Sequence, residues 1–302
     1  MSDLPWPEER AGNPQPAARF SHARSNLCLD FHGDASKALV SVLSDGNHHM
    51  ALEEALTLFV SQHPEVGEIF YSTTPARVMA EIARVGAVRI GNLQFAIKPD
   101  LFIGPPLVLK RLVDENLMQS HAPFVRSLGN VLLVQKGNPK KIYHVTDLMR
   151  DEVRLFLSNP DTETVSYQVY RECLEDLAER RNIALTFLTH PADAPDPRKL
   201  IYGERIHHRE APQAIADGSA DVAMVHYHLA LRYQRIFPQL FDWLWPDGAF
   251  DNGGCEHSHF HCGMSAQVNE WGKALYQHLM SAEVAAVYQR HGLETMVESK
   301  TF

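Results

Sequence analysis

The densest group of metal-binding side chains in this sequence lies in the segment 255–262, which reads CEHSHFHC. It holds two cysteines and three histidines: Cys255, His257, His259, His261 and Cys262. If the segment is extended, Cys255 and the three histidines share one face, because side chains alternate along a strand. Thiolate and imidazole are good ligands for Zn, Ni, Cu or Fe, so the segment is predicted to bind a transition metal ion. The alternative is a solvated loop with incidental metal affinity, since the spacing matches no common structural zinc motif.

A different kind of binding chemistry is indicated between residues 99 and 166. Three short apolar runs in this region each end in a polar or proline-containing turn, and the third turn precedes a helix. The runs are 101–103, 131–134 and 153–157. Loops that join a strand to the start of a helix present hydroxyls and free backbone N–H groups to a small ligand, often an anion. The pattern therefore favours capture of a small ion at the ends of strands.

The elements that must position these loops alternate between strand and helix, which indicates an α/β architecture with parallel sheets. The first part of the chain is predicted to hold strands at 38–43, 68–71 and 101–103 and helices at 51–62 and 76–85. The second part is predicted to hold strands at 131–135, 153–157, 184–188 and 221–225 and helices at 166–181 and 209–216. We expect an N-terminal extension over 1–37, one lobe built from 38–123 and 236–302, and a second lobe over 124–235.

Four stretches point to a known family: DLFI at 100–103, KGNP at 136–139, NP at 159–160 and ADGSADV at 216–222. Through them the chain resembles the molybdate- and tungstate-binding solute receptors, which are type II periplasmic binding proteins. The resemblance extends over roughly residues 38–235. It implies a two-lobed fold with a ligand cleft between the lobes and a non-catalytic function in solute capture. It also implies an ABC transporter permease as partner if the protein is exported.

The same resemblance implies that four loop regions line the cleft, namely 44–49, 72–75, 160–166, and 206–208 together with 226–228. Its candidate ligand-binding residues are Asn47, His48, His49, Ser72, Thr73, Thr74, Thr164, His208 and His226. In the family, hydroxyls and backbone N–H groups of the first two loops hold the oxyanion. This chain departs from the family where His226 stands in place of a tyrosine after the last strand, and where Asn47 and His48 stand in place of a serine.

Because histidines stand at the expected cleft positions, the ligand could be either a metal ion or an oxyanion. Neutral imidazole binds Zn, Ni, Cu or Fe, whereas imidazolium donates strong hydrogen bonds to an oxyanion. A metal site would weaken below about pH 6, where imidazole takes up a proton, and an anion site built on imidazolium would strengthen there. The third interpretation is that these are ordinary loop histidines in a chain that contains 17 of them.

The leading interpretation is a non-catalytic solute-binding protein that captures a molybdate- or tungstate-like oxyanion, or a transition metal ion through the cleft histidines. The alternative is a metal-dependent enzyme on the same scaffold, with a histidine-bound metal that keeps an open position. Such an enzyme needs an acid or base beside the metal, and Asp45 and Glu210 are the acidic candidates in the cleft loops. Apart from a transition metal ion no cofactor is expected, because the sequence carries no phosphate-loop, serine-hydrolase or dinucleotide-binding motif.

Composition and the first residues exclude some classes of protein and bear on where the protein is located in the cell. The formal net charge of −9 and the pI of about 6.0 argue against a nucleic-acid-binding surface. No apolar stretch reaches the roughly 18 residues that a membrane span needs, so no membrane insertion is expected. The first 20 residues lack the basic start, apolar stretch and cleavage site of a signal peptide. The chain as given is therefore expected to be cytoplasmic, or periplasmic if a signal was removed.

Overall fold

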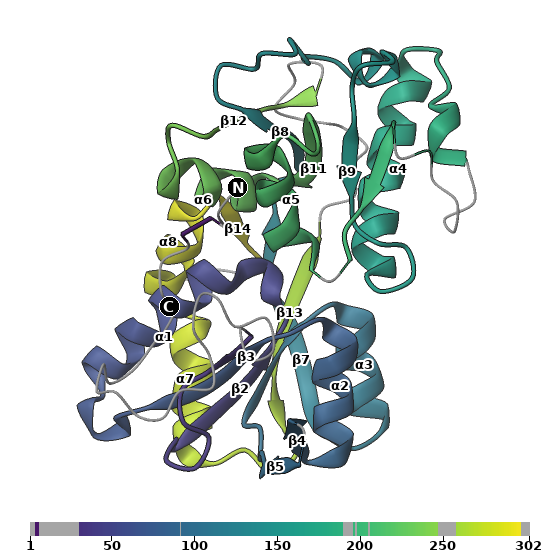
Figure 1. Cartoon of the computed structure of the whole chain (residues 1–302). Coiled ribbons are helices and arrows are strands. Elements are labelled where there is room, and N and C mark those ends of the chain that lie inside the picture. Colours follow the sequence, from purple (N-terminus) through teal and green to yellow (C-terminus); the bar gives the residue numbers. More distant parts are fainter. Residues whose placement is uncertain are drawn as a thin grey trace. The chain divides into compact units, whose positions relative to one another are not determined.

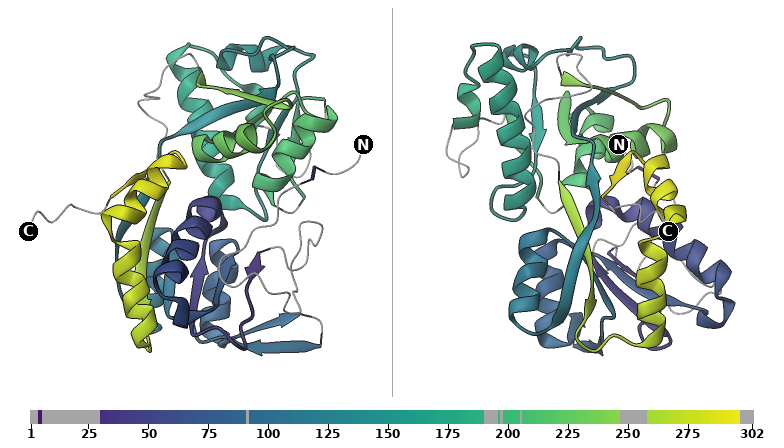
Figure 2. Two further views of the ribbon diagram at one scale, coloured as in Figure 1. Left: turned by 90° about the vertical axis from the view of Figure 1, so that its left-hand side faces the viewer. Right: turned by 180° about the vertical axis from the view of Figure 1, so that it is seen from behind.

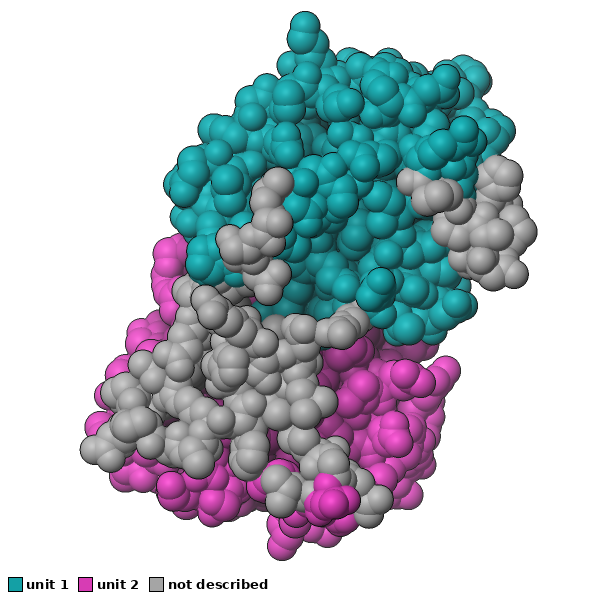
Figure 3. Space-filling model, in the orientation of Figure 1, with its two compact units in different colours: residues 1–5, 127–258 teal, residues 6–126, 259–302 magenta. Residues whose placement is uncertain are grey.

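The chain folds into two compact units, which Figure 3 colours separately. The computed structural model describes residues 4–5, 30–90, 92–189, 196, 198–204, 206–246 and 258–296. Unit 1 comprises residues 1–5 and 127–258, and unit 2 comprises residues 6–126 and 259–302. Both units are built from helices and sheets, which confirms the α/β class predicted from the sequence.

Unit 2 is organised around a seven-stranded sheet in the order β1-β3-β2-β6-β13-β7-β14 (Figure 1). Its strands are β1 (Phe31–His32), β2 (Val40–Ser44), β3 (Ile69–Thr73), β6 (Leu101–Gly104), β7 (Met118–Ser127), β13 (His259–Ser265) and β14 (Leu293–Thr295). β2 runs parallel to β3 and to β6, whereas β13 runs antiparallel to β6 and β7. The carboxyl ends of the three parallel strands therefore lie at the same end of the sheet.

Helices cover both faces of this sheet, as Figures 1 and 2 show. They are α1 (His49–Gln62), α2 (Ala76–Val85), α3 (Pro106–Asp114), α7 (Glu270–Leu279) and α8 (Ala282–Arg290), with a separate hairpin of β4 (Ala87–Ile90) and β5 (Leu93–Ala96) after α2. α2 and α3 pack on the face of β2 that carries Leu43. α1, α7 and α8 pack on the opposite face, which carries Val40 and Val42. β2 is thus apolar on both faces, as expected for a strand inside a parallel sheet.

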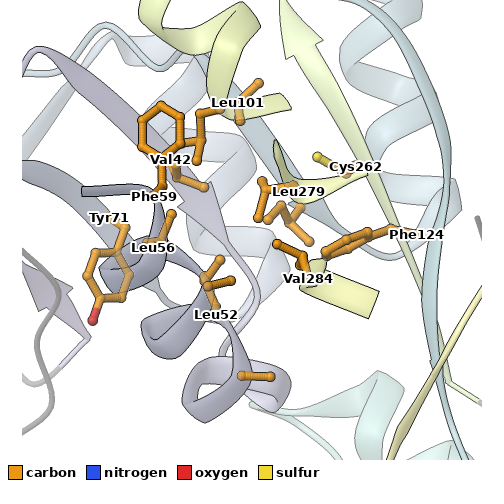
Figure 4. Close-up of a cluster of buried hydrophobic side chains, with 14 of the residues drawn as sticks. Val42, Leu52, Leu56, Phe59, Tyr71, Leu101, Phe124, Cys262, Leu279 and Val284 are labelled. Atoms are coloured by element: carbon orange, nitrogen blue, oxygen red, sulfur yellow. The ribbon is translucent and has the colours of Figure 1, made fainter. Parts of the chain in front are cut away.

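α1 is attached to its face of the sheet through one apolar stripe. Leu52, Leu56 and Phe59 are fully buried and follow the spacing i, i+4 and i+7, which places them on one side of a helix. Figure 4 shows them in one cluster with Leu279 of α7 and Val284 of α8. This packing fixes α1 against the sheet, with the short 3-10 helix η1 (Gly46–His48) between the end of β2 and the start of α1.

Unit 1 repeats the arrangement with a five-stranded sheet in the order β10-β9-β11-β8-β12. Its elements are β8 (Asn130–Gln135), β9 (Leu155–Leu157), β10 (Leu200–Tyr202), β11 (Val222–His226), β12 (Phe241–Leu244), α4 (Thr164–Arg180), α5 (His207–Asp217) and α6 (Tyr227–Ile236), with short 3-10 helices η3 (Val145–Met149) and η4 (Thr186–Thr189). β9 is parallel to β10 and β11, and β8 is antiparallel to β11 and β12. None of the described helices is long and apolar enough to cross a membrane.

Three sequence expectations differ from this structure. Residues 236–246, expected in the first lobe, lie in unit 1, because β12 pairs with β8. Residues 31–32, expected in the N-terminal extension, form β1 by antiparallel pairing with β3. The strand expected at 184–188 is replaced by η4. Leu185, just before η4, and Leu188, within it, are both buried and three positions apart, which suits the three residues per turn of a 3-10 helix.

Two described cysteines are in different chemical states. Cys173 of α4 lies in the core of unit 1 and is disulfide-bonded. Cys262 of β13 is a buried free thiol in the core of unit 2. We expect the denatured protein to show more reactive thiols after reduction than before it.

Close packing between β13 and β7 gives a first prediction. Gly263 is paired with His121, and a Cβ at Gly263 would lie 2.2 Å from the backbone oxygen of Ser120. We expect Gly263→Ala to destabilise the protein by about 2 kcal/mol or more, because backbone cannot give way as a side chain can. Gly104→Ala is the matched control, since its Cβ would lie 3.2 Å from the flexible end of Met79. Urea unfolding measures both, and equal losses of stability would contradict the packing described.

Candidate functional site

The first candidate site lies where β2 and β3 end in unit 2. Ser44 is paired with Thr73 in parallel register, so the loops that follow the two strands leave the sheet side by side. α2 begins after the second of these loops, with Pro75 at its N-cap and no side-chain hydrogen bond that caps its first turn. The first N–H groups of an α-helix have no partner within the helix and carry a partial positive charge. This end of the sheet is therefore suited to a small anion.

Thr74 is the hydroxyl residue of the second loop whose side chain the protein leaves unsatisfied. Ser72 Oγ accepts a hydrogen bond from the backbone N–H of Ser44 (3.2 Å), and Thr73 Oγ1 lies 3.0 Å from His32 Nε2. Thr74 is only 3% exposed, yet its Oγ1 has no hydrogen-bond partner among the described residues. A buried hydroxyl without a partner costs about 1–3 kcal/mol, which makes Thr74 the strongest candidate for a ligand donor in this unit.

The first loop turns its imidazoles toward the protein. His48 is fully buried, with Nε2 3.1 Å from Ser44 Oγ and Nδ1 3.0 Å from the hydroxyl of Tyr288. His49 is also buried, and its Nδ1 donates to the carbonyl of Gly46 at 2.8 Å. The ligand roles of His48 and His49 stay predictions, and His48 would have to give up one of its two bonds inside the protein to fill one.

Asp45 brings a buried carboxyl to the same strand end. It directly follows Ser44, and its Oδ1 accepts a hydrogen bond from the backbone N–H of Asn47 at 2.9 Å. Burial raises the pKa of Asp45 to about 6, and the bond from Asn47 lowers that pKa in part. Because Ser44 pairs with Thr73, the carboxyl and the Thr74 hydroxyl follow neighbouring strand positions. Asp45 can thus change the charge of this end of the sheet near neutral pH.

The second candidate site lies at the ends of β9 and β11 in unit 1. Ser158 follows β9 and His226 ends β11, and the two strands are parallel neighbours. His207, the first residue of α5, packs its ring on Phe156 of β9 and on Tyr170 of α4, with centroid distances of 5.6 and 5.0 Å. Tyr170 also contacts the ring of His226 at 5.1 Å. Two imidazoles are therefore gathered around Tyr170 at this end of the sheet.

This cluster contains buried polar atoms without partners, and its histidines are neutral. Ser158 Oγ and His207 Nε2 have no hydrogen-bond partner in the part of the chain that the structure describes. Ser158 is fully buried and His207 is 2% exposed. Burial lowers the pKa of His207 to about 3. The pKa of His226 is held well below its usual range by burial, and then by repulsion from His228 and His207. An anion here would meet neutral groups and not the imidazolium considered in the sequence analysis.

The hydrogen bonds of His226 define its tautomer. Its Nδ1 lies 2.8 Å from Asn130 Oδ1, and an amide oxygen only accepts, so Nδ1 carries the proton. Nε2 therefore keeps its lone pair, and it lies 3.5 Å from the hydroxyl of Ser258. This nitrogen can accept a hydrogen bond from a hydroxyl or bind a metal ion, but it does not donate to an anion.

Two other predicted ligand residues stand at helix starts in unit 1. Thr164 begins α4 on an exposed position, and its hydroxyl donates to the carbonyl of Pro160 at 2.8 Å. His208 is the second residue of α5, because the helix begins at His207, two residues earlier than predicted. The backbone carbonyl of His208 accepts a hydrogen bond from the hydroxyl of Tyr233. Of the two adjacent histidines, His207 is buried and its Nε2 has no partner among the described residues, whereas only His208 was a candidate ligand residue from the sequence.

The predicted metal-binding segment falls only partly within the described chain. Cys255 and His257 lie outside the described residues. In β13, His259 is exposed and His261 is half-buried, whereas Cys262 points into the core and burial raises the pKa of its thiol. Among the described residues, no group of three histidine, cysteine or acidic side chains could hold a metal ion. Metal binding by this segment stays a prediction.

Comparisons with known proteins identify the family. Residues 40–294 match the model of the bacterial extracellular solute-binding proteins, and the chain belongs to this family. No curated protein matches it. The fold is similar to the molybdate-binding protein of Azotobacter vinelandii, with a TM-score of 0.60 and 13% identity over 84% of this chain and 98% of that one. It is also similar to the tungstate-binding protein TupA of Desulfovibrio alaskensis, with a TM-score of 0.55 and 8% identity over 86% and 99% of the two chains.

A third similar structure is Peb3 of Campylobacter jejuni, with a TM-score of 0.59 and 15% identity over 84% of this chain and 99% of that one. A structure of PEB3 with L-phospholactate bound gives the same values. At such low identities the likeness establishes the fold. It confirms the predicted resemblance to type II periplasmic binding proteins, including the molybdate and tungstate receptors.

The buried carboxyl of Asp45 gives the second prediction. Its pKa is about 6 in the folded protein against 3.8 for an unperturbed aspartate. The folded state therefore binds more protons than the unfolded state between these values, so Asp45 makes stability fall as the pH rises. Keeping this carboxylate ionised costs up to about 3 kcal/mol above pH 6. We expect Asp45→Asn, which keeps the acceptor for Asn47, to raise the free energy of unfolding at about pH 8 and to change it little at about pH 4.

Urea unfolding of the parent and the variant at the two pH values measures this effect. Asp114→Asn is the control, because Asp114 is exposed and its ion pair with Lys110 is expected to contribute little at either pH. If Asp45→Asn is no more stable than the parent at about pH 8, the carboxyl does not have the environment described.

Proposed function

We propose that this chain is the solute-binding component of an ABC transporter and that it captures a small tetrahedral oxyanion. The anion is either free, as molybdate, tungstate or sulfate, or is the phosphoryl group of a small acid. The observation that carries the proposal is the buried Thr74 hydroxyl, which has no hydrogen-bond partner among the described residues and precedes the uncapped start of α2. The names of the similar structures support the same class of ligand.

The chemistry of unit 2 is suited to such an anion. Each hydrogen bond from a neutral donor to a charged oxygen contributes about 1.5–3 kcal/mol, so a few hydroxyl and N–H groups hold an oxyanion without a countercharge. The Thr74 hydroxyl and the first N–H groups of α2 converge on one end of the sheet, and the helix dipole favours negative charge there. Ser72 adds a hydroxyl that accepts from Ser44 and still has its own proton to donate.

Unit 1, taken by itself, carries a second set of candidate ligand groups at the ends of β9 and β11, and this set includes both hydrogen-bond donors and an acceptor. Among the described residues, the buried hydroxyl of Ser158 has no hydrogen-bond partner, and neither has Nε2 of the neutral His207 ring. His226 Nε2 is an acceptor. A mixture of donors and an acceptor suits a ligand that carries a hydroxyl or a protonated oxygen next to its anionic oxygens.

The proposed location is outside the cytoplasm. The family consists of extracellular solute-binding proteins. The disulfide at Cys173 agrees with this location, because disulfides persist mainly in oxidising compartments.

The other interpretations from the sequence stay predictions. A transition metal held by the predicted cleft histidines has no support from the described residues, among which no three-residue metal group is present. The metal-dependent enzyme depends on the same metal and has no separate observation in its favour. The ligand cleft between two lobes is likewise an implication of the resemblance.

The third prediction tests the proposed donor directly. Thr74→Val removes the hydroxyl and keeps the shape of the side chain. We expect the parent to bind at least one of molybdate, tungstate, sulfate, phosphate and phospholactate, and the variant to bind it about 10–100-fold more weakly, which corresponds to one hydrogen bond to a charged oxygen. Isothermal titration calorimetry measures both affinities.

Thr57→Val is the matched control for this experiment. Thr57 lies on α1, where its hydroxyl is exposed and donates to the carbonyl of Glu53 at 2.8 Å, so the variant should bind as the parent does. Zn²⁺ and Ni²⁺ are titrated in parallel. The proposal fails if none of the five anions binds, or if Thr74→Val and the parent have equal affinities.

The fourth prediction concerns pH. The Asp45 carboxylate, with its pKa of about 6, repels an anion near Thr74 at high pH and loses its charge at low pH. We expect anion affinity to rise about tenfold between about pH 8 and pH 5, and Asp45→Asn to abolish this dependence. A site built on imidazolium would keep its pH dependence in the variant, and a metal site would bind more weakly at low pH. Calorimetry at the two pH values distinguishes the three outcomes, and only the first agrees with the proposal.

A further inference from the structure

Two histidines that are 140 positions apart in the sequence face each other on the sheet of unit 2. The Nδ1 atoms of His121, on β7, and His261, on β13, lie 2.8 Å apart. The ring centroids are 4.9 Å apart and the ring planes are inclined by 57°. Both side chains are half-buried.

The register of the two strands explains why the rings meet. His121 is paired with Gly263, which lies two residues from His261 on the same strand. Residues in such a diagonal relation are within reach of aromatic side chains. Gly263 has no side chain to separate the rings, and the crowding at its Cβ position keeps a larger residue out. The pairing is therefore held by the β7–β13 ladder and does not depend on a loop.

The geometry leaves a nitrogen lone pair at the centre of the pair. Two Nδ1 atoms at hydrogen-bond distance share one proton, so one nitrogen donates and the other accepts. A metal ion that replaces this proton binds both nitrogens. Two nitrogens that are each about 2.0–2.1 Å from a tetrahedral metal ion are roughly 3.3 Å apart, so the rings need to separate by only about 0.5 Å. Small side-chain rotations provide that movement without any change in the strands.

We propose that His121 and His261 bind one divalent first-row transition metal ion through their Nδ1 atoms, with water in the remaining positions. Cu²⁺ is expected to bind most tightly and Ni²⁺ and Zn²⁺ less so, following the general order for nitrogen ligands. This site goes beyond the proposed oxyanion function. It also differs from the sequence prediction, because its second ligand is His121 and not a cysteine of the segment 255–262.

The charges around the pair are compatible with a bound cation. Burial lowers the pKa of both rings, so both are largely neutral at neutral pH. Lys110 of α3 lowers the pKa of His121 further by repulsion, but its ammonium is paired with Asp114 at 2.7 Å, which offsets its charge. His259 is close enough to lower the pKa of His261 and is the nearest further imidazole on the same strand.

The test is Cu²⁺ titration of the full chain by calorimetry at about pH 7.5. We expect the parent to bind one equivalent that is lost, or weakened at least tenfold, in both His121→Ala and His261→Ala. His63→Ala is the matched control, because His63 is a half-exposed histidine of the same unit with a single carboxylate, Glu65, at 3.7 Å. Electron paramagnetic resonance of the Cu²⁺ complex should show two nitrogen ligands in the parent.

The outcomes distinguish this two-histidine site from other possible Cu²⁺ sites on the protein. If Cu²⁺ affinity is unchanged in His121→Ala but falls in Cys255→Ser, the metal is held by the segment of the sequence prediction and the proposal is overturned. It is also overturned if His63→Ala loses as much affinity as the two test variants, or if the parent binds no Cu²⁺. Circular dichroism confirms that each variant is folded. The oxyanion titrations should be unaffected by His121→Ala, so failure of either proposal leaves the other testable.

Discussion

Parallel pairing of β2 with β3 is the constraint on which the candidate anion site depends. Because Ser44 lies opposite Thr73, the following residues, Asp45 and Thr74, leave the sheet at the same place. The next helices begin there with their positive ends, since strands and helices alternate along the chain. Unit 1 repeats this logic with β9 and β11, whose ends bring Ser158 and His226 together. In both units the apolar cores hold the strands in register, and the polar groups follow from that register.

The polar atoms left without partners are informative because they are expensive in free energy. Thr74 Oγ1, Ser158 Oγ and His207 Nε2 are each buried, and each unmade hydrogen bond costs about 1–3 kcal/mol. In either unit, a ligand that completed such a bond would remove that cost and add its own charge-assisted bonds. Since His207 and His226 of unit 1 are neutral, we expect selectivity at that end of unit 1 to depend on the position of donors and acceptors more than on charge. In unit 2 the carboxyl of Asp45 can carry a charge, and we expect it to make anion affinity depend on pH.

The fold was largely predictable from the sequence, and the site only in part. The helix predicted at 76–85 has those bounds in the structure, because Pro75 and Gly86 stop it on both sides and its apolar spacing is regular. The start of α5 was placed two residues late, because Ile206 is no capping residue and gives no signal there, and the buried His207 was missed as a result. The pairing of His121 with His261 depends on strand register across 140 positions, which local patterns do not encode.

The most direct test of the central claim is the position of a heavy oxyanion in a crystal of the protein grown with tungstate. Anomalous scattering from tungsten locates the ion independently of any model of the ligand. The account predicts one strong peak within hydrogen-bond distance of Thr74 Oγ1, at the start of α2. A strong peak away from Thr74, or no peak at a saturating tungstate concentration, would contradict it.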